Sequence, residues 1–162
     1  MKNLLMPGLA LALALALMVG LVACTAVDES SIVKTKAEDG TIELFDKNDN
    51  RDCYFSFKTG KHRLEQGNDC RNNELYSFKL NNVPSAATII VADAGDCGKD
   101  ENFYFKFKTI KYEVSTDYIR LDNIPSFEEG AVVAPGLRLI EMHAPGATIG
   151  GKWSCLEIIR SE

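Results

Sequence analysis

Histidine is scarce in this chain of 162 residues, and its scarcity limits the catalytic chemistry that the chain can support. A serine or cysteine nucleophile needs a nearby base, which is most often a histidine. His62 lies between Lys61 and Arg63, which predicts an exposed loop, and His143 shortly precedes a Pro-Gly turn. The Gly-x-Ser-x-Gly sequence typical of α/β hydrolases is also missing. The sequence therefore predicts a protein that is not an enzyme.

Closely spaced metal ligands are missing as well. The cysteines occur singly rather than in the C-x-x-C pairs of zinc sites. Residues 46–52 are rich in Asp and Asn, but an EF-hand loop requires glycine where Arg51 stands and glutamate where Phe57 stands. Gly150-Gly151-Lys152 is followed by Trp153 rather than by the Ser or Thr of a phosphate-binding loop. We therefore predict no cofactor, a solvated connection at 46–52 and a core position for Trp153.

A helical repeat is missing from the chain after residue 23, where no window of 11 or more residues shows a 3.6-residue hydrophobic period. Residues 52–58 and 102–108 alternate instead, with Phe55 and Phe57 on one face and Phe103, Phe105 and Phe107 on one face. This period of two, rich in aromatic residues, is typical of half-buried antiparallel strands. The sequence predicts an all-β fold, a small antiparallel sandwich, with loops at 46–52, 60–73 and 126–136.

The chain also contains an internal repeat. Residues 76–85 align with residues 117–126, and each is followed by a strand-like segment that ends in an acid, at 89–93 and 137–141. Residues 55–59 match 105–109, and 31–34 with 41–46 fit the same scheme. The repeat predicts a duplicated unit of strand, turn, strand, cysteine-bearing loop and strand, occurring about three times from residue 30 onward.

One segment of this repeat, Asn72-Asn73-Glu74-Leu75-Tyr76-Ser77, resembles the motif that precedes the closing strand in βγ-crystallins. The resemblance implies a double Greek key, and in that family the corresponding positions ligate calcium, here Asn72, Asn73 and Ser77. Calcium usually needs six to eight oxygens with several carboxylates, which these residues do not supply. We therefore predict no functional metal site. Another small antiparallel sandwich or barrel, or a threefold β arrangement, remains open.

The N-terminus carries Lys2 and then an apolar run that ends in Leu21-Val22-Ala23-Cys24. These four residues resemble the lipobox of bacterial lipoproteins. The resemblance implies a signal peptide at 1–23, a diacylglyceryl group on Cys24 with further acylation such as palmitate, a tether at 24–29 and a β domain at 30–162. Because Thr25 rather than Asp follows the cysteine, the family's sorting rules favour the outer membrane. An uncleaved membrane anchor and ordinary cleaved export are the alternatives.

Four cysteines remain when Cys24 is assigned to lipid: Cys53, Cys70, Cys97 and Cys155. An even number in an exported chain predicts two disulfides, for which three pairings exist. We favour Cys53–Cys70, which closes a short loop rich in turn residues, together with Cys97–Cys155, which ties the C-terminal strand to the rest of the domain.

Charge limits the choice of partner. Lys2 is the one charged side chain before Cys24, so the mature chain carries 17 basic and 23 acidic residues, a net charge of −6. An acidic balance argues against nucleic acid and against docking on anionic lipid through a basic patch. The sequence predicts an envelope lipoprotein, held to the membrane by Cys24, whose β domain binds another macromolecule, as in an inhibitor of a hydrolase. The alternative is a structural or stress-related envelope protein stabilised by calcium.

Overall fold

The computed structural model describes residues 39–64, 70–145 and 148–161, which belong to one compact unit, Lys36–Glu162. The signal peptide predicted at 1–23, the tether at 24–29 and Cys24 lie outside the described residues. Within those ranges the elements are β1 (Thr41–Phe45), β2 (Arg51–Ser56), β3 (Gly60–Arg63), β4 (Ser77–Asn81), β5 (Thr88–Ala92), β6 (Tyr104–Thr109), β7 (Ile119–Arg120), the 3-10 helix η2 (Leu121–Ser126), β8 (Val132–Ala134), β9 (Leu137–His143) and β10 (Cys155–Ile159).

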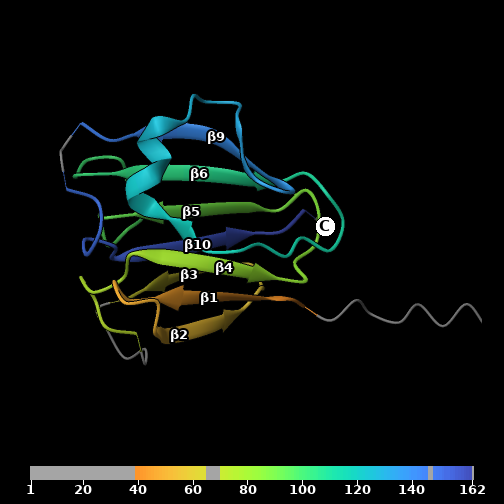
Figure 1. Ribbon diagram of the computed structural model, residues 1–162, viewed down its shortest axis with the longest axis horizontal. Helices are drawn as coiled ribbons and strands as arrows, with labels where there is room; N and C mark the ends of the chain where they lie inside the picture. The colour runs from red at the N-terminus through yellow and green to blue at the C-terminus, as the bar shows by residue number, and fades with distance from the viewer. Residues whose placement is uncertain (1–38, 65–69, 146–147, 162) are drawn as a thin grey trace, which may run out of the picture. The chain divides into compact units, whose positions relative to one another are not determined.

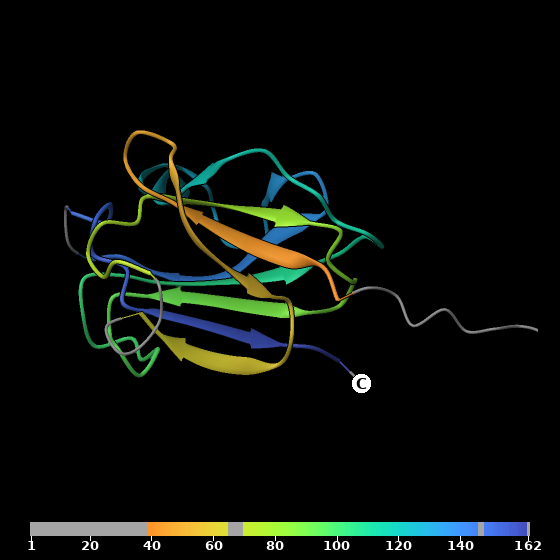
Figure 2. The same ribbon diagram turned by 90° about the horizontal axis from the view of Figure 1, so that it is seen from below.

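The strands form two antiparallel sheets that pack face to face (Figures 1 and 2). One sheet has four strands in the order β2-β1-β4-β7, and the other has six in the order β3-β10-β5-β6-β9-β8. The predicted all-β antiparallel sandwich is therefore confirmed. No helix among the described residues is long and apolar enough to cross a membrane.

The core lies between the sheets and follows the predicted period of two. Phe105 and Phe107 on β6 are fully buried, and the Phe107 ring lies 5.8 Å from the ring of Phe78 on β4 in the opposite sheet. Trp153 is buried against Phe78, as predicted for a core residue. Tyr104 points to the outer face of the six-stranded sheet, yet it too is buried. The outer face of this sheet is therefore not exposed to solvent everywhere.

Two segments predicted as parts of loops are strands. β3 pairs with β10, and β8 pairs with β9 through an irregular register. Both are edge strands of the six-stranded sheet, and both are short. A short edge strand buries few side chains, so its sequence carries little hydrophobic alternation, and its backbone partners determine its conformation.

The aligned segments 76–85 and 117–126 take different structures. The first forms β4 through Asn81, whereas the second leaves β7 after Arg120 and continues as η2. Leu121 and Ile124 are spaced three apart, which places both on one side of a 3-10 helix, and both are buried. η2 therefore packs Leu121 and Ile124 into the main core, where the first copy of the repeat continues as a strand.

Candidate binding site

The four cysteines form the two disulfides that the sequence analysis favoured, Cys53–Cys70 and Cys97–Cys155. Cys53 lies on β2 and points into the core, so the first bridge holds the chain that follows β3 against the four-stranded sheet. The bridge encloses a short stretch of sequence, and it fixes Arg71 beside the β1–β2 hairpin.

The second disulfide holds the β5–β6 connection over the outer face of the six-stranded sheet. Cys97, in this connection, bonds to Cys155 at the start of β10, and the two cysteines form a small buried cluster with Ile90, Ala92 and Tyr104. Lys99 extends over the Tyr104 ring and hydrogen-bonds to Glu141 on β9. This cover explains why Tyr104 is buried although it points away from the main core.

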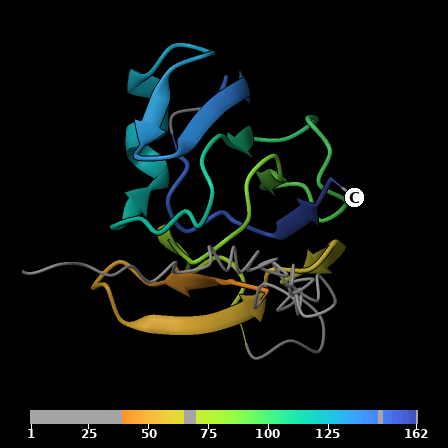
Figure 3. The same cartoon turned by 90° about the vertical axis from the view of Figure 1, so that its right-hand side faces the viewer.

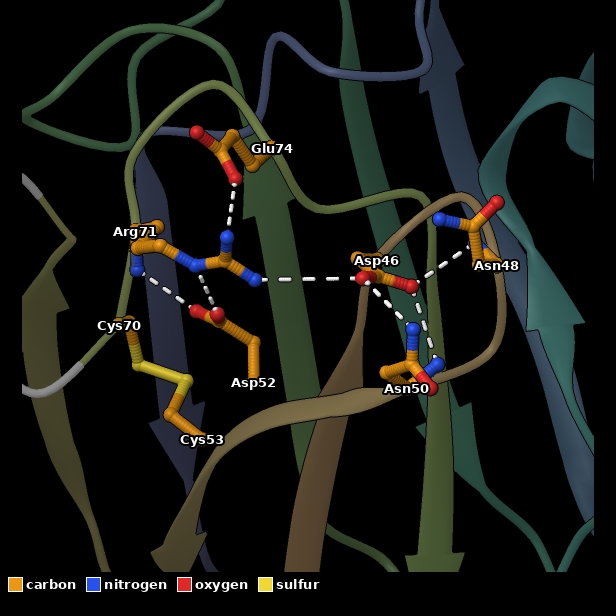
Figure 4. Close-up of polar contacts among 8 residues, drawn as sticks. All are labelled: Asp46, Asn48, Asn50, Asp52, Cys53, Cys70, Arg71 and Glu74. Atoms are coloured by element: carbon orange, nitrogen blue, oxygen red, sulfur yellow. Dashed lines mark hydrogen bonds and ion pairs between the residues drawn. A yellow bond between two sulfur atoms is a disulfide. The ribbon is translucent and has the colours of Figure 1, made fainter.

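The acidic segment 46–52 is the turn of the β1–β2 hairpin, and Asp46 organises it (Figure 4). The backbone amides of Asn48 and Asn50 donate to Asp46 Oδ1 at 2.8 and 3.0 Å. Partial desolvation acts to raise the pKa of Asp46, but a hydrogen bond from the Asn50 side chain to Oδ2 and the two backbone hydrogen bonds outweigh it and lower that pKa. The carboxylate therefore serves the turn itself, in agreement with the predicted connection and not with an EF-hand.

Arg71 joins this hairpin to the chain after the first disulfide. Its guanidinium lies 2.5 Å from Asp52, 2.6 Å from Glu74 and 3.9 Å from Asp46 (Figure 4). The hydrogen bond and the negative charge of Asp52 raise the pKa of Arg71. The positive charge of Arg71 offsets the mutual repulsion of these three carboxylates, so the cluster stabilises the local fold. Across the described ranges no group of three or more His, Cys, Asp or Glu side chains could hold a metal ion.

The calcium candidates Asn72, Asn73 and Ser77 lie in three different local environments. Asn72 Oδ1 accepts a hydrogen bond from Ser154 Oγ at 3.0 Å, beside β10. Asn73 adopts a positive φ of 59°, a turn conformation that asparagine tolerates. Ser77 is fully buried at the start of β4, and its hydroxyl has no hydrogen-bond partner within the described part of the chain.

The two histidines differ in their surroundings. His62 was predicted in an exposed loop, but it lies on β3 and is half-buried, with its ring 4.3 Å from that of Phe55 on β2. Burial lowers the pKa of the His62 imidazole, because an apolar environment disfavours the charged form. His143 is exposed at the end of β9, so the two histidines share no site.

The outer edges of the two sheets meet at one side of the sandwich. β7 is the last strand of the four-stranded sheet and β8 is the last strand of the six-stranded sheet, and each has one neighbour among the described strands. η2 lies beside the β8–β9 hairpin (Figure 3), and residues of β7, η2 and β8 line the same space. The free edges of β7 and β8 therefore border the same space.

This space is a groove of about 620 Å³, which we call the edge groove. Its floor, taken as the buried or half-buried apolar lining residues, is surrounded by a largely polar rim, an arrangement common in binding sites. The floor is formed by Ile119, Ile124, Phe127, Val133 and Ala134, and the rim by Ser115, Thr116, Asp117, Tyr118, Arg120, Asn123, Ser126 and the exposed Pro135. Arg120 is fixed by two hydrogen bonds of 2.7 Å to the Asp49 carboxylate, so the β1–β2 hairpin braces one wall of the groove.

No protein-family model, no curated protein and no solved structure matches this chain.

The edge groove was not foreseen from the sequence, although one signal pointed to its location. Pro125 lies inside the second copy of the repeat at a position where the chain forms η2 rather than continuing β7. Its counterpart Pro84 follows β4, which ends as an ordinary strand. The same residue type occurs in both copies, so the pattern alone does not show which strand ends early and leaves an open edge.

Proposed function

We propose that this protein is a lipid-anchored protein of the cell envelope whose β domain binds another envelope macromolecule without catalysing a reaction. The observation that carries the proposal is the edge groove, where two free sheet edges border an apolar floor. Free strand edges offer backbone donors and acceptors to an extended segment of a partner, and apolar pockets supply affinity. A partner that is itself an envelope hydrolase would make the protein an inhibitor.

The scaffold supports this proposal. Two disulfides and the Arg71 cluster hold the loops around the sheets in fixed positions. A rigid scaffold lowers the conformational entropy that a binding surface loses when its partner docks. The residues Leu21-Val22-Ala23-Cys24 support attachment to a membrane.

Filling the edge groove is expected to abolish binding. In Asn123→Arg/Ser126→Arg, two exposed rim residues become long cations that occupy the groove. In a capture experiment from envelope extract, we expect the amount of partner retained by this variant to be lower than that retained by wild type by a factor of about ten or more. The matched control is Asn48→Arg/Ser56→Arg, which adds the same charges at exposed positions outside the groove.

The control variant should retain the partner as wild type does, and the retained fraction should contain a hydrolase if the protein is an inhibitor. Equal capture by the groove variant, the control and wild type would show that the edge groove is not the binding site.

The lipid anchor makes a separate prediction. Acylation requires the Cys24 thiol, so Cys24→Ser should accumulate as a precursor that keeps its signal peptide and incorporates no labelled palmitate. Thr25→Ser is the control, because it leaves the thiol in place. Metabolic labelling followed by electrophoresis measures both properties. Labelling of Cys24→Ser at the wild-type level would remove the lipoprotein assignment.

A further inference from the structure

Positive charge gathers on the outer face of the six-stranded sheet, although the chain as a whole is acidic. Residues that pair across strands share a face, so the register places the outward side chains of this sheet together. Its outward charged residues are Lys61, Arg63, Lys106, Lys108 and Arg138 against Glu141 and Glu157. The β5–β6 connection covers the other end of this face and carries Asp93, Asp96, Asp100 and Glu101 against Lys99. The cationic part of the face is therefore the end where β5 begins, at Lys108 and Arg138.

Two of these cations lie directly opposite each other. Lys108 on β6 pairs in register with Arg138 on β9, and both side chains are exposed. Like charges at opposite positions of neighbouring strands destabilise a sheet. Lys106 and Lys61 lie near carboxylates, at 4.0 and 3.9 Å from Glu141 and Glu157. Within the described ranges Lys108 and Arg138 have no such ion pair, which leaves them free to meet an anionic partner.

Aliphatic side chains flank these two cations. The register runs from Ile159 on β10 through Thr88 on β5 to Lys108, Arg138 and then Val132 on β8. Ile159 is 44% exposed and Val132 is 50% exposed. Ile110, which follows β6 by one residue and continues its outward alternation, is also exposed. Cations beside exposed aliphatic side chains are the chemistry of protein surfaces that bind anionic lipid.

The chain enters the domain beside this row. Arg160, directly after Ile159, donates a hydrogen bond to Asp39, the first described residue. The start of β1 and the C-terminal end lie on the same side of the molecule (Figure 2). The segment between Cys24 and Asp39 spans at most about 50 Å when fully extended. A lipid on Cys24 would therefore keep the domain within that distance of the bilayer, and a tether of this length makes weak contacts with the membrane effective.

We propose that the outer face of the six-stranded sheet, centred on Lys108 and Arg138, docks on the anionic phospholipid surface of the membrane to which the protein is anchored. This inference rests on the lipid anchoring proposed above. The aliphatic residues favour lipid over a soluble anion, because Ile159, Val132 and Ile110 gain by leaving water at the bilayer interface. Docking through this face would fix the orientation of the domain relative to the membrane, which the tether alone does not do.

The test uses the lipid-free chain from Thr25 to Glu162, which contains the whole compact unit Lys36–Glu162. We expect it to sediment with vesicles of phosphatidylcholine and phosphatidylglycerol, not with pure phosphatidylcholine, and to be released at high salt. Each cation near an anionic surface strengthens binding roughly fivefold. Lys108→Glu/Arg138→Glu should therefore weaken binding at least about 25-fold.

The matched control is Lys47→Glu/Lys152→Glu, which changes the net charge equally but lies in the β1–β2 turn and before β10. It should bind vesicles within about threefold of wild type. Val132→Ser/Ile159→Ser should weaken vesicle binding several-fold without changing any charge. A melting curve for each variant confirms that it is folded.

Three results would overturn the proposal: no binding of the wild-type chain to anionic vesicles, binding that high salt does not change, or equal loss in the two charge-reversed variants. Binding to poly-glutamate but not to vesicles would assign the face to an acidic polypeptide and would also overturn it. None of these results depends on acylation of Cys24, which palmitate labelling tests separately.

Discussion

Reduction of both disulfides is expected to lower the free energy of unfolding by about 7 kcal/mol. The sequence separations are 17 residues for Cys53–Cys70 and 58 residues for Cys97–Cys155. In the loop-entropy model the two bridges stabilise the fold by about 3 and about 4 kcal/mol. A small domain is stable by about 5–15 kcal/mol, so a loss of this size amounts to about half of the stability or more. Urea unfolding with and without reductant measures the difference.

Two paired variants separate the bridges. Cys97→Ala/Cys155→Ala should be the less stable, both because its loop is longer and because the cover over Ile90 and Tyr104 is released. Cys53→Ala/Cys70→Ala should lose less stability. Mass spectrometry after alkylation without reductant provides the direct control. Modification of all four cysteines in the folded protein would contradict the prediction.

The second large effect is expected in the core. Phe107→Ala should lower the free energy of unfolding by about 3–5 kcal/mol, because it removes a fully buried ring and leaves a cavity between the sheets. Phe105→Ala and Phe57→Ala should cost similar amounts, since both rings are also fully buried. Phe55 is only partly buried, so Phe55→Ala should cost less.

Neighbouring outward positions serve as controls for the core variants. Ser56→Ala on β2 and Lys108→Ala on β6 replace exposed side chains, and each should change the stability by no more than about 0.5 kcal/mol. Chemical denaturation of the six variants measures the contrast. A similar loss at Phe107 and at Lys108 would mean that β6 does not have one inward and one outward face.

The sequence predicted those features of the fold that depend on local alternation. Phe105 and Phe107 alternate with lysines, so the strand and its inward face could be identified before the structure was known. The disulfide pairing followed from loop length and from the position of Cys155 near the C-terminal strand. β3 was missed because Lys61, His62 and Arg63 are all polar or charged, and only its pairing with β10 shows that they form a strand.

The candidate surfaces could not be predicted, because they depend on residues that are distant in the sequence. Lys108 and Arg138 become neighbours only through the pairing of β6 with β9, and the edge groove needs both β7 and β8 to be edge strands. The acidic net charge led us to predict no docking on anionic lipid through a basic patch. The net charge of a chain does not show how its charged side chains are divided between the faces of a sheet. The register of the strands shows this.

The position of β10 has a consequence for the order of folding. β10 is the last of the described strands in sequence, yet it lies inside the six-stranded sheet, between β3 and β5. β3 therefore has no neighbour in that sheet until β10 arrives, and the contacts that complete the sheet join residues far apart in the chain. Such non-local pairing is slow, because the chain must close long loops before it gains the pairing energy. The larger sheet can therefore close only after the last described strand has been synthesised, so an unfinished chain stays unfolded for longer.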